Sequence, residues 1–166
     1  MINNVASEVY TEVISPGRIN IIGEHTDYNN GFVLPSAIDK SIVFKMRKNN
    51  SKYKCTIESE GFASVLNVDL RSIKRSKVSW ENYILGVLDE LLKKEVNIRG
   101  FDCTITSQLP VGAGLSSSAA LECGLASGLN QLFQLGISRK DIAFFRNLLS
   151  TNLWAQNVES WINLHP

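Results

Sequence analysis

Pro16-Gly17-Arg18-Ile19-Asn20-Ile21-Ile22-Gly23-Glu24-His25-Thr26-Asp27-Tyr28 is the stretch that decides how this chain is interpreted. It places an arginine, two carboxylates, a histidine and a tyrosine within a short span that contains two glycines. Such a density of ionisable groups is unfavourable in a core, but it suits a ligand with many hydroxyls, because carboxylates accept hydrogen bonds and imidazole donates or accepts them. The alternative is a surface turn with incidental charges.

A second motif lies about ninety residues downstream, Leu109-Pro110-Val111-Gly112-Ala113-Gly114-Leu115-Ser116-Ser117-Ser118-Ala119-Ala120, between an expected strand and an expected helix. Its glycines allow close backbone approach, and the free N–H groups that open a helix suit phosphate oxygens. The three serines add hydroxyl donors, one of which can bind the magnesium that accompanies ATP. The pattern is not a Walker A loop, since no Gly-Lys-Ser/Thr follows. The alternative is a serine-rich helix cap after a flexible turn.

In this order and at this spacing, the two motifs resemble the signatures of galactokinases, within the superfamily of homoserine, galacto-, mevalonate and phosphomevalonate kinases. Weaker relatives share the Pro-Gly-Arg-x-Asn part, and the Gly-Glu-His-Thr-Asp-Tyr continuation points to the sugar kinases. The resemblance implies an α+β fold that forms the amino-terminal lobe of a two-lobed small-molecule kinase, with the carboxyl-terminal lobe absent. It covers residues 8–145, so we assign residues 1–145 to this lobe.

The resemblance also implies an activity, which is phosphoryl transfer from MgATP to the anomeric hydroxyl of galactose. Arg18 would be catalytic, beside the transferred phosphoryl group and the family's catalytic aspartate, where it stabilises negative charge. The sugar hydroxyls would be held by Glu24, His25, Thr26 and Asp27. The nucleotide phosphates would be held by Gly112, Ala113, Gly114, Leu115, Ser116, Ser117 and Ser118, and Ser118 would also bind Mg²⁺.

A third match to the family is a Trp-x-x-Tyr-x-x-Gly helix, formed here by Trp80, Tyr83 and Gly86. We interpret its two aromatic residues as core, with contact to the adenine of ATP as the alternative.

The composition is that of a globular domain, with 166 residues, 44% hydrophobic residues, 20% charged residues and a net charge of +1. The balanced charge argues against nucleic-acid and membrane partners, and no apolar run approaches the roughly 20 residues of a membrane helix. The basic cluster at residues 45–48 is interpreted as a solvated turn. The odd number of distant cysteines, with Cys103 and Cys123 expected to be buried, indicates a reducing cytoplasm. We expect a monomer when the protein is full length.

Residue patterns predict strands at residues 8–14, 32–34, 41–46, 54–58 and 101–106, with turns at 29–31 and 49–51. Helical periodicity predicts a helix at residues 80–94, and a composition rich in alanine and leucine predicts another at residues 119–132. A capping box that starts at Ser138 and includes Asp141 predicts the beginning of a third helix.

The resemblance stops near Phe145, and residues 146–166 form a tail that does not match. The family continues its third helix into an Ala-Glu-His run and then Cys-Gly-Ile-Met-Asp-Gln, whose aspartate is the catalytic residue. The chain as written lacks that base and the helix with a second magnesium ligand, so we expect it to be inactive.

The tail is compatible with the family sequence read in another frame. Codons formed from the third base of one residue and the first two bases of the next, starting after Asn147, can encode SAEHKFVGTKCGIMDQFAS. At the Trp154–Ala155 junction the genetic code permits only glycine, the first glycine of this string. At the Trp161–Ile162 junction it permits only aspartate, the aspartate of Met-Asp-Gln. The other residues require only permitted synonymous codons. We therefore hypothesise a single-base slip near Arg146. The alternative is a genuine divergent carboxyl terminus.

Two other functions stay open. One is a non-enzymatic sugar and ATP sensor of the same fold, although such relatives lack part of the Ser-Ser-Ser-Ala-Ala loop that is complete here. The other is an unstable truncation product. We expect the chain to be poorly folded, because the apolar faces of helices 80–94 and 119–132 would lose part of their cover.

Overall fold

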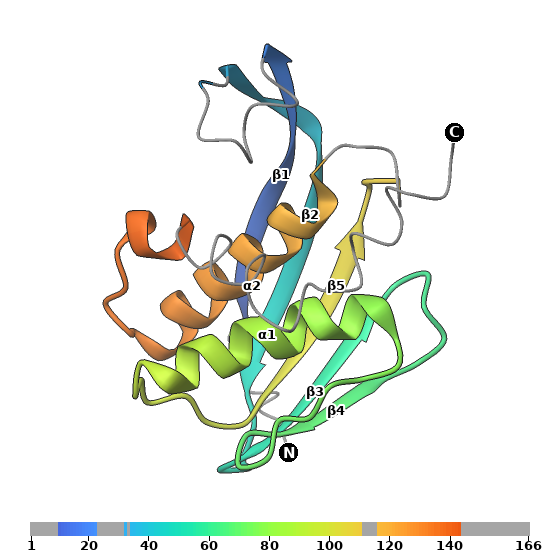
Figure 1. Ribbon diagram of the computed structural model, residues 1–166. Helices are drawn as coiled ribbons and strands as arrows, with labels where there is room; N and C mark the ends of the chain where they lie inside the picture. Colours follow the sequence, from blue (N-terminus) through green and yellow to red (C-terminus); the bar gives the residue numbers. More distant parts are fainter. Residues whose placement is uncertain (1–9, 23–31, 33, 111–115, 144–166) are drawn as a thin grey trace, which may run out of the picture.

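The computed structural model describes residues 10–22, 32, 34–110 and 116–143. Its elements follow the chain in the order β1 (Thr11–Ile22), β2 (Leu34–Lys48), β3 (Lys54–Ser59), β4 (Leu66–Asp69), α1 (Ser79–Lys93), β5 (Phe101–Ser107) and α2 (Ser117–Phe133). The strands form one mixed sheet, and both helices lie on the same face of it (Figure 1). This is the α+β fold that the sequence predicted.

The strand order in the sheet is β1-β2-β5-β3-β4. β2 is antiparallel to both β1 and β5, β3 is antiparallel to β4, and β3 with β5 forms the parallel pair. The chain reaches that parallel pair through β4 and α1, a crossover of the kind that parallel strands require.

Alternation along the central strands places their apolar side chains against the helices. In β2 the buried residues are Ile42, Phe44 and Met46, and the strand register sets Phe44 opposite Ile105 and Met46 opposite Cys103 of β5. Because side chains of a strand point alternately to its two faces, the residues between them face away from the helices.

Both helices bury their apolar faces on the sheet and on each other. Ile84, Leu88 and Leu91 of α1 and Leu125 and Leu129 of α2 are completely buried. The expectation that these faces lose part of their cover is wrong for these five side chains, whereas the expectation of poor folding stays a prediction.

Several predicted elements differ in extent. The predicted strand at 41–46 lies within β2, which begins at Leu34, whereas Phe32 of the predicted strand at 32–34 lies outside any strand. β1 extends to Ile22. Pro16 is tolerated in β1 because β1 is an edge strand of the sheet, where a missing N–H donor costs no ladder bond. β4 was not predicted; its short Leu66-Asn67-Val68-Asp69 sequence shows only two periods of alternation.

The interpretation of residues 45–48 as a solvated turn is wrong. These residues are the end of β2, where Met46 is fully buried and Arg47 forms a 3.1 Å ion pair with Asp102 of β5. Lys48 Nζ lies 5.3 Å from the centre of the Phe133 ring. Strand alternation therefore leaves Lys45 and Arg47 on the face opposite to Met46.

The predicted turn at 49–51 and the predicted cap at Ser138 are confirmed. Asn49 Oδ1 accepts a 3.0 Å hydrogen bond from the backbone N–H of Ser51. Ser138 Oγ accepts a 3.1 Å bond from the backbone N–H of Asp141 and donates a 2.6 Å bond to its carboxylate. Residues 139–143 are helical, as expected.

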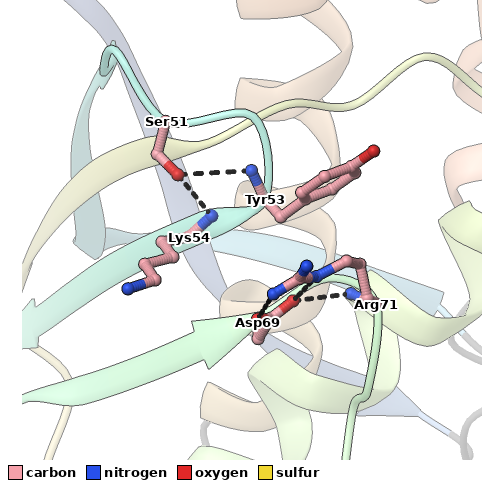
Figure 2. A network of polar contacts seen from close by, with 5 residues as sticks. All are labelled: Ser51, Tyr53, Lys54, Asp69 and Arg71. Carbon is pink, nitrogen blue, oxygen red and sulfur yellow. Dashed lines mark hydrogen bonds and ion pairs between the residues drawn. The ribbon is translucent and has the colours of Figure 1, made fainter.

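A polar network fixes the β3–β4 edge of the sheet (Figure 2). The Asp69 carboxylate accepts bonds from Arg71 Nε (2.9 Å), Nη2 (2.6 Å) and backbone N–H (3.0 Å). The Arg71 guanidinium lies 4.9 Å from the centre of the Tyr53 ring, and Ser51 Oγ accepts from the N–H groups of Tyr53 and Lys54. These bonds to Arg71 lower the pKa of Asp69 to about 2.

Candidate functional site

The beginnings of the two sequence motifs meet in the structure, although they are far apart in the chain. A Cβ placed on Gly17 would lie 2.5 Å from Cδ2 of Leu109 and 3.0 Å from Cδ1 of Ile38. Leu109 is buried and precedes Pro110, at the entrance to the glycine-serine loop. Because only glycine permits this close approach, Gly17 brings the strand of the first motif into contact with the start of the second motif.

Two glycines set the direction of α2 along β1. A Cβ on Gly128 would meet Met46 and lie 3.7 Å from Val13, and one on Gly124 would meet Phe44 and lie 2.9 Å from Cβ of Ser15. Four residues of helix and two of strand both advance about 6–7 Å. α2 therefore runs beside β1, and its amino end points toward the end of β1 that carries Arg18.

The amino end of α2 leaves its backbone donors uncapped by a side chain. Ser116, the residue before the helix, has φ +52° and makes no side-chain cap hydrogen bond, unlike Ser138. The first turn of α2 carries no acidic residue. The backbone N–H groups at the start of a helix attract anions, and a non-glycine residue in the left-handed region is a feature that functional sites often hold.

On β1, the residues after Gly17 reverse the usual pattern of burial. A register shift separates Pro16 from Arg18. Beyond it, Arg18 and Asn20 are half-buried, whereas Ile19 and Ile21 are exposed. Arg18 Nε and Asn20 Oδ1 are both buried atoms, so this end of β1 directs polar groups inward. An inward guanidinium suits the binding of phosphate or carboxylate.

Trp80 lies at the start of α1, next to a cluster of polar residues that fixes the first turn of the helix. Its side chain is 9% exposed, and its ring centre lies 5.2 Å from that of Phe62. The neighbouring carboxylate of Glu81 accepts hydrogen bonds from the hydroxyls of Ser76 and Ser64. The prediction that Trp80 belongs to the core is confirmed.

Asn82 completes this cluster. Its Oδ1 accepts a 2.9 Å bond from the backbone N–H of Ser76, and its Nδ2 donates a 3.0 Å bond to the Ser76 carbonyl. The two bonds pin the loop that precedes α1 to the first turn of the helix. Sequence reasoning missed this cluster, because short polar residues before a helix are common and do not reveal which of them pair.

Tyr83 of α1 and Glu122 of α2 form an ionisable pair between the two helices. Glu122 is 7% exposed and lies one helical turn after Ser118 on α2. Burial, and after it the negative charge of Glu122, raise the pKa of Tyr83. The phenol therefore stays neutral at physiological pH, next to a buried carboxylate.

Several predicted site residues lie outside the described residues. These are Glu24, His25, Thr26 and Asp27 of the first motif and Gly112, Ala113, Gly114 and Leu115 of the second. Arg18 lies on β1, and Ser116, Ser117 and Ser118 lie at the amino end of α2, all partly buried. Within the described ranges there is no group of three or more His, Cys, Asp or Glu residues that could hold a metal ion. None of the helices described there is long and apolar enough to span a membrane.

Family models match the segments of the chain that carry the two motifs. The galactokinase galactose-binding signature matches residues 7–48, and the amino-terminal domain of the GHMP kinases matches residues 82–158. The second match runs past Phe145, near which the resemblance described in the sequence analysis stops. A galactokinase of Thermosipho africanus is 41% identical over 133 residues. The chain belongs to the galactokinase family.

The galactokinase match covers 79% of this chain but 36% of the Thermosipho africanus protein. The structure of Lactococcus lactis galactokinase complexed with galactose aligns with a TM-score of 0.81 at 33% identity, over 88% of this chain and 38% of that one. The mevalonate kinase of Methanococcus jannaschii shares the fold, with a TM-score of 0.69 at 20% identity, over 88% of this chain and 47% of that one. The chain thus spans 36% and 38% of the two galactokinases and corresponds to their amino-terminal part.

Proposed function

We propose that this chain is the part of a galactokinase that holds galactose and the phosphates of ATP. The reaction is transfer of the terminal phosphoryl group of ATP to the anomeric hydroxyl of galactose. The observation that carries the proposal is the contact of Gly17 with Leu109, which joins the galactose-binding signature to the glycine-serine loop. A sugar hydroxyl can meet a phosphoryl group only if the two binding segments are adjacent.

The residues of the two motifs have different roles in this proposal. Glu24, His25, Thr26 and Asp27 hold the sugar hydroxyls, and the backbone from Gly112 to Ser118 holds the phosphates. Arg18 stabilises the negative charge that builds up during transfer, which is how proteins mainly accelerate phosphoryl transfer. The inward setting of Arg18 on β1 and the uncapped start of α2 support these roles.

Magnesium accompanies ATP in such reactions and neutralises phosphate charge when bound. The first turn of α2 fits one ligand of such an ion, because Ser118 offers a hydroxyl there. Mg²⁺ takes its other ligands from phosphates, water and one or two carboxylates. Ser118 would therefore be the ligand that this turn offers to the ion, whose other ligands would come from nucleotide, water and carboxylates.

We propose further that the 166-residue chain alone does not phosphorylate sugar, because its tail replaces the segment that carries the catalytic aspartate. A single-base slip near Arg146 explains the tail. Sequencing the source DNA across codons 143 to 150 tests this explanation. Codons incompatible with the shifted string would contradict it.

Isothermal titration calorimetry of the chain with galactose and with MgATP, accompanied by an assay for ADP release, separates the alternatives. The proposal predicts sugar binding without turnover, and it predicts that an Arg18→Lys chain still binds galactose. A sensor would bind both galactose and MgATP. Adding the rest of a galactokinase would not change its affinity for either ligand. A misfolded product would bind neither ligand.

A further inference from the structure

Asn20 lies on β1 two residues after Arg18, in a part of the strand where the pairing is irregular. In the first half of β1, Val13 and Ser15 pack beside α2. A register shift between Pro16 and Arg18 then changes which residues point inward, so that Arg18 and Asn20 are half-buried, and a second shift follows Asn20. Alternation places these two side chains on the same face. Shifts of this kind re-aim side chains and are frequent next to active sites.

The amide oxygen of Asn20 is buried and unsatisfied. Among the residues that the structure describes, no group donates a hydrogen bond to this Oδ1 atom. The register partner of Asn20 on β2 is Pro35, and proline has neither a backbone N–H nor a polar side chain. Burial of an amide oxygen without a donor costs free energy, so such an atom requires an explanation. A bound ligand can supply the missing donor.

The chemistry of this oxygen selects the sugar over the nucleotide. An amide oxygen only accepts hydrogen bonds, and every sugar hydroxyl can donate one. The phosphate oxygens of ATP are themselves acceptors at neutral pH, so they would repel the amide oxygen.

The order of residues along the chain favours the same ligand. Asn20 lies between Arg18 and the segment from Glu24 to Asp27, to which we assign the sugar hydroxyls. Two residues of strand advance about 6–7 Å, which is comparable to the width of a hexose. A sugar whose reacting hydroxyl meets the phosphoryl group near Arg18 therefore has other hydroxyls within reach of Asn20.

We propose that Asn20 is a further sugar-binding residue, whose Oδ1 accepts a hydrogen bond from a galactose hydroxyl that does not react. The anomeric hydroxyl gives up its proton during transfer, so one of the other hydroxyls is the donor. A site built to hydrogen-bond a hydroxyl rejects a sugar that lacks it, because the buried partner is then left unpaired. Asn20 therefore contributes to sugar specificity. This inference rests on the proposed function.

Isothermal titration calorimetry of the 166-residue chain tests the role of Asn20. The ligands are galactose, MgATP and the four galactose derivatives that lack the hydroxyl at carbon 2, 3, 4 or 6. Asn20→Leu should weaken galactose binding about five- to tenfold, the effect of losing one hydrogen bond between neutral groups, and should leave MgATP binding unchanged. Asn67→Leu is the matched control, because Asn67 is exposed on β4, the edge strand on the opposite side of the sheet from β1. This control should bind galactose like the unaltered chain.

Two further readouts separate sugar binding from a structural role. For one of the four deoxy sugars, Asn20→Leu should cause no further loss of affinity, because the hydrogen bond that the substitution removes is already absent. Circular dichroism without ligand should give Asn20→Leu a melting temperature equal to or above that of the unaltered chain, because an apolar group replaces an unpaired buried oxygen.

Unchanged galactose affinity of Asn20→Leu would overturn this inference and leave the proposed function intact. Equal losses of affinity for galactose and all four deoxy sugars would also overturn it, as would a lowered melting temperature or a failure of the variant to fold, because these results indicate a structural role. A loss of affinity for MgATP in place of galactose would assign the residue to the nucleotide and contradict the inference. An unaltered chain that binds no galactose would overturn the proposed function together with this inference.

Discussion

Gly17 of β1 and Leu109, two residues beyond the end of β5, lie so close that a single added methyl group would come to 2.5 Å from the leucine side chain. The contact joins two segments that are about ninety residues apart in the chain. It places the strand that carries Arg18 against the entrance to the glycine-serine loop. A substitution at residue 17 should therefore disturb both segments at once.

We expect Gly17→Ala to lower the free energy of unfolding by about 1–3 kcal/mol, the usual cost of overpacking a core. Leu109→Ala removes the side chain that the new methyl group would strike. The double variant should therefore be more stable than the sum of the two single effects predicts. Urea unfolding of the four proteins checks this. Strict additivity would show that the two residues are not in contact.

The two glycines of α2 should differ in their tolerance of alanine. A Cβ on Gly124 would lie 2.2 Å from Cε2 of Phe44, a rigid ring, whereas one on Gly128 would meet the flexible end of Met46. Gly124→Ala should destabilise by about 1–3 kcal/mol because the ring cannot move aside. Gly128→Ala should cost less, since methionine adapts its shape. Thermal melts of both variants measure which of them loses more stability. A larger loss for Gly128→Ala than for Gly124→Ala would contradict this packing.

The buried thiols should respond weakly to alkylating reagents. Burial raises the pKa of Cys55 to about 11 and that of Cys103 to about 12. At pH 8, Cys55 then forms about a hundredfold less thiolate than an ordinary cysteine. Cys123 is only half-buried, in contrast to our expectation, and should react first. Mass spectrometry after timed iodoacetamide treatment measures the order of labelling, and equal rates would contradict the burial.

These two thiols also predict a pH dependence of stability. Their folded pKa lies above the unfolded value of 9.0, so the folded state retains protons that the unfolded state loses. Their contribution is complete below pH 9 and is lost as the pH rises toward 11–12. Unfolding free energy should therefore fall above pH 9. The Cys55→Ala, Cys103→Ala double variant should show a shallower fall, and an unchanged slope would exclude the thiols as its cause.

In a frame-restored, full-length enzyme, Arg18→Lys should lower kcat far more than it raises KM for galactose. Lysine keeps the charge but loses the planar fork that engages phosphate and carboxylate together. Asp27→Asn should mainly weaken sugar binding, because an amide is a poorer acceptor than a carboxylate. Steady-state kinetics of the two variants make the comparison. If both mainly alter KM, Arg18 binds substrate without stabilising the transition state.

Much of the fold follows from local patterns. The helices at Ser79–Lys93 and Ser117–Phe133 match their predicted spans because their apolar residues recur at helical spacing. β4 was missed because four residues carry little periodicity, and the end of β1 was missed because Pro16 and Gly17 look like a turn. Pairing with β2 overrides that local preference.

The candidate site was predictable in its parts but not in its arrangement. Arg18 and Ser116–Ser118 were identified from the motifs, whereas the contact between Gly17 and Leu109 depends on how β1 and β5 pair with β2. The clamp of Glu81 and Asn82 onto Ser76 likewise depends on tertiary packing. Local sequence specifies which groups are available, and the sheet order specifies which of them meet.

Galactose-dependent ADP release, measured for the frame-restored full-length protein beside the 166-residue chain, tests the central claim most directly. We expect the restored protein to turn over at ordinary kinase rates, about 1–100 per second, and the 166-residue chain to show no release above background. Turnover by the 166-residue chain at such rates, or a restored protein that folds but releases no ADP with galactose, would contradict the account.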